Sequence, residues 1–420
     1  MAPAGRIDGL SVHEDTTVGW CEATPPNETT DDDGLPVFRD AGFSAGDPRA
    51  PRRRAHDDPG VVGLREHLRR HNGLPGLQVF DPADVDAAAE AFFRDGFVVV
   101  RDLLDADLLA QAREASTEAL RRILAIAGVG GRRYVTETAR LPHRYSYGTS
   151  SASRQLLHEP LWARLIDLDA TRPLLARLFA GTDHFVRGAG GDLCLPGAIE
   201  YQQLHWDRPE PFVFPPGRLA AARAAGVDVD DPGAGAGIDP RLVVPVLERT
   251  PPKVTINFLM SDLTWENGPI RHVAGSHVRP SFPPTLADEP EWMRMSTLVG
   301  APAGAGVFRD LRAWHGGTPN VSRQVRAMPN VEYSAGWDDR GEVTRAMPHT
   351  VWSNLGEHGR WLCRHVVAPP GVWPSGAGVV HPLASVRRAS STLPAAPTGV
   401  AASQPAGAPG TAPLDPRPGP

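Results

Sequence analysis

A series of short, strand-like segments in the second half of the chain most constrains the fold. Turns containing Gly or Pro separate these segments, which read "HFVRGAGGDLCL", "AIEYQQLHWD", "KVTINFLMSD", "IRHVAGSH", "GAGVFRD" and "RAMPNVEYSAGW" from residue 184 onward. Several short strands with turn signals between them predict a sandwich or a barrel. The 43 Gly and 43 Pro residues also favour turns over long helices.

The region before these strands has helical periodicity. Asp81 followed by Pro82 predicts a helix start, with Asp as N-cap and Pro in the first turn. The run "FVVV" at Phe97–Val100 predicts a short strand, and Pro160–Gly181 predicts further helix. A helix between them has one apolar face, formed by Leu108, Ala112, Ala115, Ala119 and Ile123.

Composition divides the chain into three parts. Residues 1–75 are predicted to be a poorly ordered extension, because blocks of like charge separated by Pro and Gly rarely build a core. Residues 76–370 are predicted to form one domain with an inserted loop or lid, rich in Pro, Gly and Ala, at 209–252. Residues 371–420 are predicted to be a tail, since Leu393–Pro420 contains eight Pro, seven Ala and four Gly.

Charge and cysteine content exclude several classes of protein. The net charge of −6 argues against a protein that binds nucleic acid or a membrane surface. The cysteines Cys21, Cys194 and Cys363 are far apart, which disfavours a zinc ribbon or a disulfide framework. We find neither an apolar signal segment nor a run of about eighteen apolar residues. A cytoplasmic protein that acts on a small molecule is therefore expected, with its oligomeric state left open.

The segment "YQQLHWDRPE" carries a candidate metal site. On a strand, residues i and i+2 share a face, so His205 and Asp207 would point together while Trp206 points away. A third ligand must come from another strand, and His315 is the candidate. Two His and one carboxylate suit non-haem Fe(II) and leave positions open for a 2-oxo acid and dioxygen. Arg326 would then pair with the far carboxylate of that acid.

The H-x-D spacing alone is weak, because it occurs twice more. His13-Glu14-Asp15 and His56-Asp57-Asp58 lie outside any strand-like pattern and are interpreted as solvated polar residues. Simpler alternatives also remain for the chosen residues. His205 with Asp207 would then be a polar strand end. His315 would be a core histidine with satisfied hydrogen bonds, and Arg326 would be a surface ion-pair partner.

Four features in order resemble the phytanoyl-CoA dioxygenase family of Fe(II)- and 2-oxoglutarate-dependent oxygenases. They are "QLHWD" ending at Asp207, "DLTWENGPIRHVAGSH" at Asp262–His277, "HGGTPN" at His315–Asn320, and Arg326. "FFRDGFVVVRDLL" at Phe92–Leu104 resembles the start of the family domain, and the resemblance spans residues 80–336. The "ENGP…AGSH" block is its most specific part.

The resemblance implies a mainly β fold with flanking helices, a double-stranded β-helix that is also called a jelly roll and is cupin-like. It implies iron held by His205, Asp207 and His315, and 2-oxoglutarate held by Arg326. Asn257, Thr318 and Arg144 would line the cosubstrate site. The family often has a hydroxyl two residues after the distal histidine, where this chain has Gly317. His272 and His277 are expected to be structural.

The implied activity is hydroxylation of a small molecule, with release of succinate and CO2. A halogenase is disfavoured because those enzymes replace the carboxylate ligand, and Asp207 is present. Two alternatives stay open: a desaturase or epimerase on the same fold, and a non-catalytic jelly-roll binding protein.

Overall fold

The computed structural model describes residues 6–7, 10–11, 19–24, 54–128, 143–148, 155–181, 183–207, 251–279, 282–336, 338 and 343–377. Nearly all of the predicted insertion at 209–252 lies outside the described residues, as do His13 and the predicted tail beyond residue 377. In the described part of the chain, no helix is long and apolar enough to cross a membrane.

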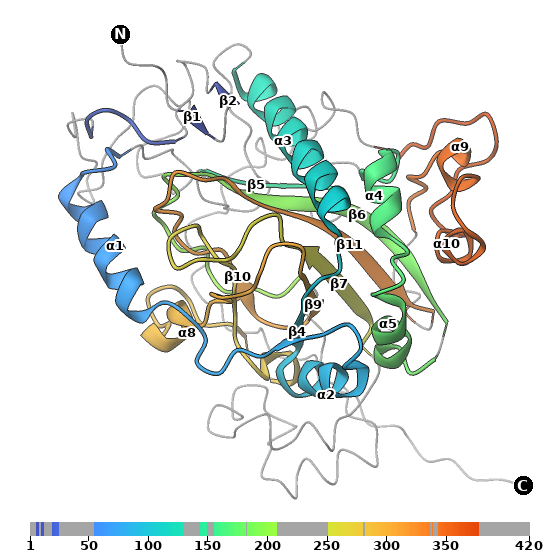
Figure 1. The fold of residues 1–420 in the computed structure, drawn as a ribbon, viewed down its shortest axis with the longest axis horizontal. Helices are drawn as coiled ribbons and strands as arrows, with labels where there is room; N and C mark the ends of the chain where they lie inside the picture. The colour runs from blue at the N-terminus through green and yellow to red at the C-terminus, as the bar shows by residue number, and fades with distance from the viewer. Residues whose placement is uncertain are drawn as a thin grey trace, which may run out of the picture.

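A seven-stranded sheet forms the centre of the molecule, in the order β3-β4-β9-β7-β11-β6-β5 (Figure 1). Its strands are β3 (Val79–Phe80), β4 (Phe97–Val100), β5 (Arg144–Tyr147), β6 (His184–Cys194), β7 (Lys253–Phe258), β9 (Gly306–Asp310) and β11 (Arg326–Ala335). Every pairing is antiparallel except that of β3 with β4. The predicted β-rich fold with flanking helices is confirmed at this level.

A second, smaller set of strands pairs separately. Strand β8 (Arg271–His272) pairs with β10 (His315–Gly316), and His205 adds an isolated bridge to His315. The prediction of a regular strand over residues 198–207 is wrong, because only two isolated bridges form, from Ala198 to Asn320 and from His205 to His315. The segment is fixed instead by spaced backbone hydrogen bonds, from Gln202 N to Gly317 O and from Asp207 N to Leu311 O.

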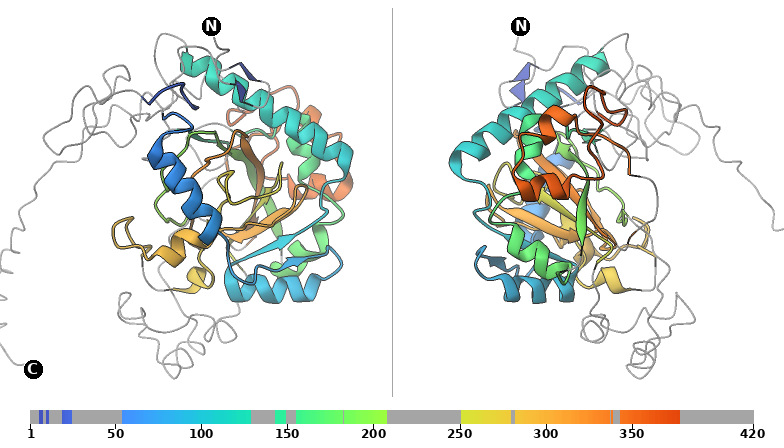
Figure 2. Two further views of the ribbon diagram at one scale, coloured as in Figure 1. Left: turned by 60° about the vertical axis from the view of Figure 1, so that its left-hand side comes forward. Right: turned by 90° about the vertical axis from the view of Figure 1, so that its right-hand side faces the viewer.

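Helices cover one face of the large sheet (Figures 1 and 2). They are α2 (Val85–Asp95), α3 (Ala106–Gly128), α4 (Pro160–Leu165) and α5 (Arg172–Leu178). The first of them begins three residues later than predicted. Phe80 is still in β3, and Asp84 N donates to Asp81 O, so residues 81–84 form a turn and Asp84 takes the N-cap position.

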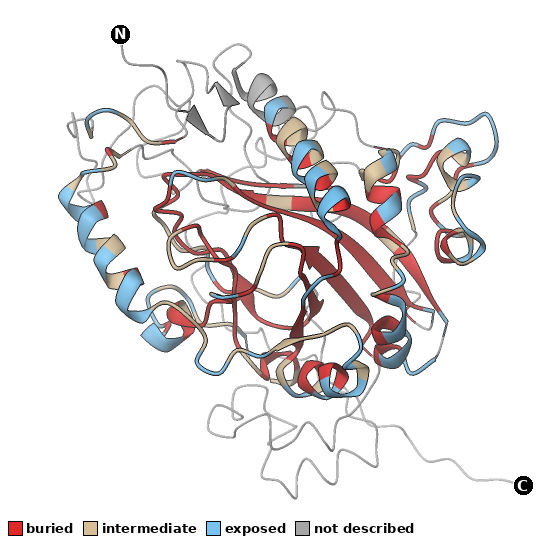
Figure 3. Ribbon diagram, in the orientation of Figure 1, coloured by how far each residue is buried: buried red, intermediate tan, exposed pale blue. Residues whose placement is uncertain are grey.

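Strand β11 shows how the two faces of the sheet differ. Val331 and Tyr333 belong to the largest apolar core, under the helices. The alternate residues Arg326, Asn330 and Glu332 point to the other face, where they line a pocket. The strands are buried and the outer helix surfaces are exposed (Figure 3). This period-two alternation separates an apolar layer from a polar one.

The prediction that residues 1–75 are poorly ordered is wrong from Arg54 onward. Helix α1 (Pro59–His71) starts at Asp58, whose side chain accepts a hydrogen bond from Gly60 N at 2.8 Å. This contact is an N-cap, so Asp58 is not merely a solvated residue. Leu68 on the helix is fully buried, and the His56 ring lies 5.1 Å from that of Trp20. This part of the chain therefore belongs to the folded body.

Shorter elements complete the described chain. They are β1 (Arg6–Ile7), β2 (Leu10–Ser11), the 3-10 turn η5 (Ser276–Val278), α8 (Glu291–Met295), α9 (His349–Trp352) and α10 (Glu357–Leu362). The last two helices lie beside α4 and β6 (Figure 2). Cys21, Cys194 and Cys363 are not joined by disulfide bonds.

Candidate functional site

His205, Asp207 and His315 meet at one point of the pocket. One ligand atom from each lies within 4.8 Å of the others, and no second group of this kind occurs in the part of the chain that the structure describes. The Nε2 atoms of His205 and His315 lie 3.7 and 3.5 Å from the Asp207 carboxylate oxygens. The donor set and its spacing fit a divalent metal ion such as Fe(II).

Backbone carbonyls orient both histidine rings. His205 Nδ1 lies 3.1 Å from Gln203 O, and His315 Nδ1 lies 3.0 Å from Ala313 O. An Nδ1–H that donates to a carbonyl leaves the Nε2 lone pair for a metal. Arg309 Nη1 lies 3.3 Å from the same His315 nitrogen. A guanidinium only donates, so the carbonyl contact is the one that fits the metal-binding tautomer.

Arg309 on β9 fixes the carboxylate ligand, and the sequence interpretation missed it. Its Nη2 donates to Asp207 Oδ2 at 2.7 Å, and the side chain is buried. Burial alone would raise the pKa of Asp207, but Arg309, His315 and His205 outweigh it and hold that pKa well below the usual range. The available signal was an arginine inside the apolar strand "GVFRD", six residues before the distal histidine.

The same surroundings keep the distal histidine neutral. Burial, followed by the positive charge of Arg309, lowers the pKa of His315 well below 6.5. A neutral imidazole is the form that binds metal, whereas an imidazolium has no free lone pair. Near neutral pH the site therefore presents a carboxylate and an uncharged imidazole together.

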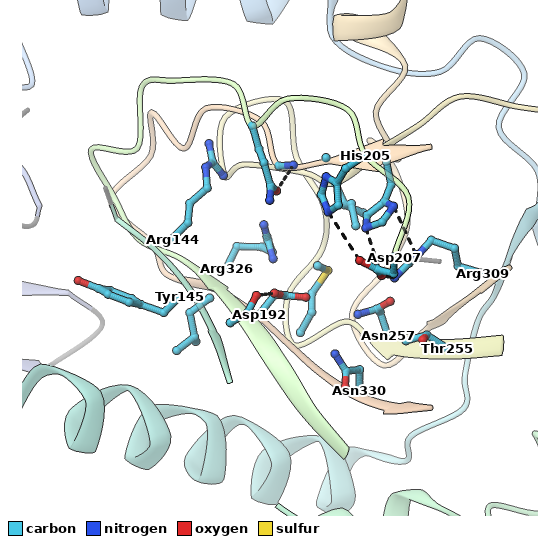
Figure 4. A pocket seen from close by; sticks show the side chains of 18 of the residues that line it. Arg144, Tyr145, Asp192, His205, Asp207, Thr255, Asn257, Arg309, Arg326 and Asn330 are labelled. Atoms are coloured by element: carbon cyan, nitrogen blue, oxygen red, sulfur yellow. Dashed lines mark hydrogen bonds and ion pairs between the residues drawn. The ribbon is translucent and has the colours of Figure 1, made fainter. Parts of the chain in front are cut away.

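Two arginines lie at the other end of the pocket (Figure 4). Arg326 is buried, and its Nε donates to Gly268 O at 3.0 Å. Its Nη1 has no hydrogen-bond partner among the described residues. Arg144 donates from Nη2 to Glu200 O and Thr318 O, both at 2.6 Å, and from Nη1 to Cys194 Sγ. An unpaired guanidinium nitrogen in a buried pocket fits an anionic ligand.

The remaining predicted residues divide into two groups. Asn257 on β7 lines the pocket, as the resemblance implies. Thr318 does not line it, because its hydroxyl is buried and donates to Pro269 O at 2.5 Å. A Cβ at Gly317 would lie 2.6 Å from Arg144 Nη1, so a larger residue there would displace that arginine. This contact explains glycine where the family often has a hydroxyl.

The "ENGP" and "AGSH" stretches have structural roles. Asn267 makes a turn, accepting from Thr264 N and donating to Asp262 O. Gly268 follows with a φ of 72°, and a Cβ there would meet Cys194 Sγ at 2.8 Å. The turn positions the carbonyl that holds Arg326.

His272 and His277 are buried, and neither belongs to the group of candidate metal ligands. His272 stacks on Phe97 at 4.7 Å, and His277 Nε2 lies 3.2 Å from Phe93 O.

Comparison with known proteins gives limited similarity. No family model matches the chain. AviO1 from Streptomyces viridochromogenes Tue57 is 20% identical over 60% of this chain and 96% of its own, with a TM-score of 0.36. ThoJ, described as a non-heme monooxygenase, is 20% identical over 59% of this chain and 77% of its own, with a TM-score of 0.39. These TM-scores do not establish a shared fold.

Proposed function

We propose that the protein is an Fe(II)- and 2-oxoglutarate-dependent oxygenase of the phytanoyl-CoA dioxygenase type that hydroxylates a small molecule. One observation carries this proposal. The His205–Asp207–His315 group and the unpaired Nη1 of Arg326 line the same pocket. A metal protein needs only the first of these, whereas a 2-oxo acid with a second carboxylate also needs the buried cation.

The proposal includes a double-stranded β-helix. Its support is that two sets of strands contribute to one pocket. His315 comes from β10, while Thr255, Arg309 and Asn330 come from the large sheet. Two sheets whose inner faces enclose a site are the arrangement that a jelly roll provides.

The residues of the chain have distinct roles in this reaction. Fe(II), when bound, would activate dioxygen for C–H oxidation. The triad would hold the metal, and Arg309 would keep the Asp207 carboxylate in its ligating orientation. Arg326, with Arg144 beside it, would bind the distal carboxylate of 2-oxoglutarate. The sum is R–H + O2 + 2-oxoglutarate → R–OH + succinate + CO2, in which one atom of O2 enters R–OH, the other enters succinate, and CO2 comes from the carboxylate of 2-oxoglutarate next to the keto group.

Two alternatives use the same residues. A desaturase or epimerase would also form succinate but would add no oxygen to its product. A non-catalytic binding protein would keep the pocket without turnover, but such a protein has no need of a complete ligand set with oriented imidazoles.

Succinate formation tests the proposal. The purified protein, loaded anaerobically with Fe(II), is mixed with oxygenated 2-oxoglutarate, and succinate is quantified by mass spectrometry. We expect slow uncoupled succinate formation that disappears in His315→Ala. A wild-type protein that binds Fe(II) but forms no succinate above the metal-only blank would contradict the oxygenase assignment. Incorporation of an oxygen atom from 18O2 into the product then separates hydroxylation from desaturation and epimerisation.

A further inference from the structure

The pocket has a polar wall that neither the metal nor the cosubstrate explains. Thr255, Asn330 and Glu332 form it, and all three are at least nine-tenths buried. The strand register brings them together. Glu332 pairs with Thr255 across β11 and β7, and Thr255 pairs with Arg309 across β7 and β9. Figure 4 shows Thr255 and Asn330 on the side of the pocket near Asp207 and away from Arg326.

The distance along β11 separates this wall from the cosubstrate arginine. Arg326 and Glu332 are six residues apart on one extended strand, which is about 20 Å at roughly 3.3 Å per residue. By the same rule, the Cα atoms of Asn330 and Arg326 are about 13 Å apart along the strand. A five-carbon dicarboxylate anchored at Arg326 is too short to reach the far end of the wall. Glu332 and Thr255 are therefore available for another ligand.

One buried oxygen atom in this wall, Asn330 Oδ1, has no hydrogen-bond donor among the described residues. Asn330 is 4% exposed, and its Oδ1 accepts no hydrogen bond from any described residue. Burying an amide oxygen without a donor is unfavourable. The oxygen lies in the lining of the pocket, so a bound ligand can supply the donor.

The local charge distribution indicates which kind of donor fits. The Glu332 carboxylate lies 3.6 Å from Arg187 Nε and 4.0 Å from Lys253 Nζ. Asp338 Oδ2 also lies 4.0 Å from Lys253 Nζ, so two cations and two carboxylates balance here and an ammonium group would meet no net attraction. Both Glu332 and Asn330 still offer acceptor oxygens, and Thr255 offers a hydroxyl that donates and accepts. Neutral hydroxyl groups satisfy all three side chains.

We propose that Thr255, Asn330 and Glu332 form the recognition surface for the oxidised substrate, and that this substrate is a neutral, polyhydroxylated small molecule. The inference rests on the proposed function, since it takes the metal pocket as the active site. A hydrocarbon would leave the three polar groups unpaired and would bind weakly for that reason.

Ligand-observed saturation-transfer NMR on the full-length protein tests the inference without turnover. The probes are myo-inositol and sorbitol, with cyclohexanol, hexan-1-ol and cyclohexylammonium as matched comparisons. Binding is measured with and without Zn(II) and 2-oxoglutarate. We expect at least one polyol to bind at least tenfold more tightly than every comparison compound. Equal or tighter binding of an alcohol or the ammonium, or no polyol binding at all, would overturn the proposal.

Substitutions locate the binding. Asn330→Leu and Glu332→Gln should each weaken polyol binding about tenfold. Thr255→Val, which keeps the side-chain shape, should weaken it severalfold and serves as the test if the other variants do not fold. Tyr333→Phe is the control, because it removes a buried hydroxyl from the opposite face of β11, where that hydroxyl donates to Ile166 O. Polyol binding that is unchanged in all folded wall variants would refute the assignment.

This experiment separates the two proposals. If polyols bind at the wall and no succinate forms, the oxygenase assignment fails and the wall stands only as a polyol-binding surface. If succinate forms and polyols do not bind, the oxygenase assignment stands and the substrate class is wrong.

Discussion

Replacing Arg326 should weaken the binding of 2-oxoglutarate without removing the metal. Arg326 is 4% exposed, and its Nε donates to Gly268 O at 3.0 Å, while Nη1 has no partner among the described residues and can bind a ligand. A hydrogen bond to a charged group contributes about 1.5–3 kcal/mol, and about 1.4 kcal/mol corresponds to a factor of ten. We therefore expect Arg326→Ala to raise the apparent KM for 2-oxoglutarate by about tenfold to about 150-fold.

The assay is uncoupled succinate production against 2-oxoglutarate concentration, with iron content measured in parallel. Arg326→Lys should fall between the wild type and the alanine variant, because it keeps the charge but not the planar fork. Arg360→Ala is the matched control, since Arg360 also donates to a backbone carbonyl, at 2.7 Å, but lies outside the pocket. An iron-loaded Arg326→Ala protein that titrates like the wild type would refute the assignment and make Arg144 the next candidate.

Three further predictions concern the metal site and the core. Iron content, measured by mass spectrometry, should fall sharply in His205→Ala and His315→Ala but stay unchanged in His56→Ala. Arg309→Leu should weaken Co(II) binding by about 10–100-fold in an absorbance titration, because the ligand carboxylate loses its orienting donor. Burial lowers the pKa of His277 to about 4, so the unfolded state binds the extra proton between pH 6.5 and 4. Urea denaturation should show stability falling by up to roughly 3 kcal/mol as pH drops through that window, and His277→Gln should abolish most of this dependence.

The sequence predicted the regular elements where local pattern decides structure. The run "FVVV" became β4, and "RAMPNVEYSA" became β11, because β-branched or alternating side chains favour a pleated, half-buried surface. The helix boundary at Asp81 and the strand before Asp207 were wrong. In both places long-range contacts decide: β3 continues to Phe80, and the metal-bearing segment is fixed by hydrogen bonds to Gly317 and Leu311.

Within the site, residue types at family spacing were easier to predict than supporting residues. His205, Asp207 and His315 come together as expected, and whether they bind iron stays a prediction. Arg309 was missed because its role depends on β9 lying beside β7, and no local pattern encodes that pairing. Thr318 was assigned to the cosubstrate by position in a motif, whereas its hydroxyl faces a backbone carbonyl.

The two-faced character of β11 limits how this protein can change during evolution or engineering. Because alternate residues face the core and the pocket, a one-residue insertion or deletion would turn Val331 and Tyr333 toward the pocket and bring charged side chains under the helices. Length changes in this strand should therefore be lethal to folding. Point substitutions at Asn330 or Glu332 leave the apolar layer intact, so new substrate preferences are most accessible through single-residue changes at alternate positions of one strand.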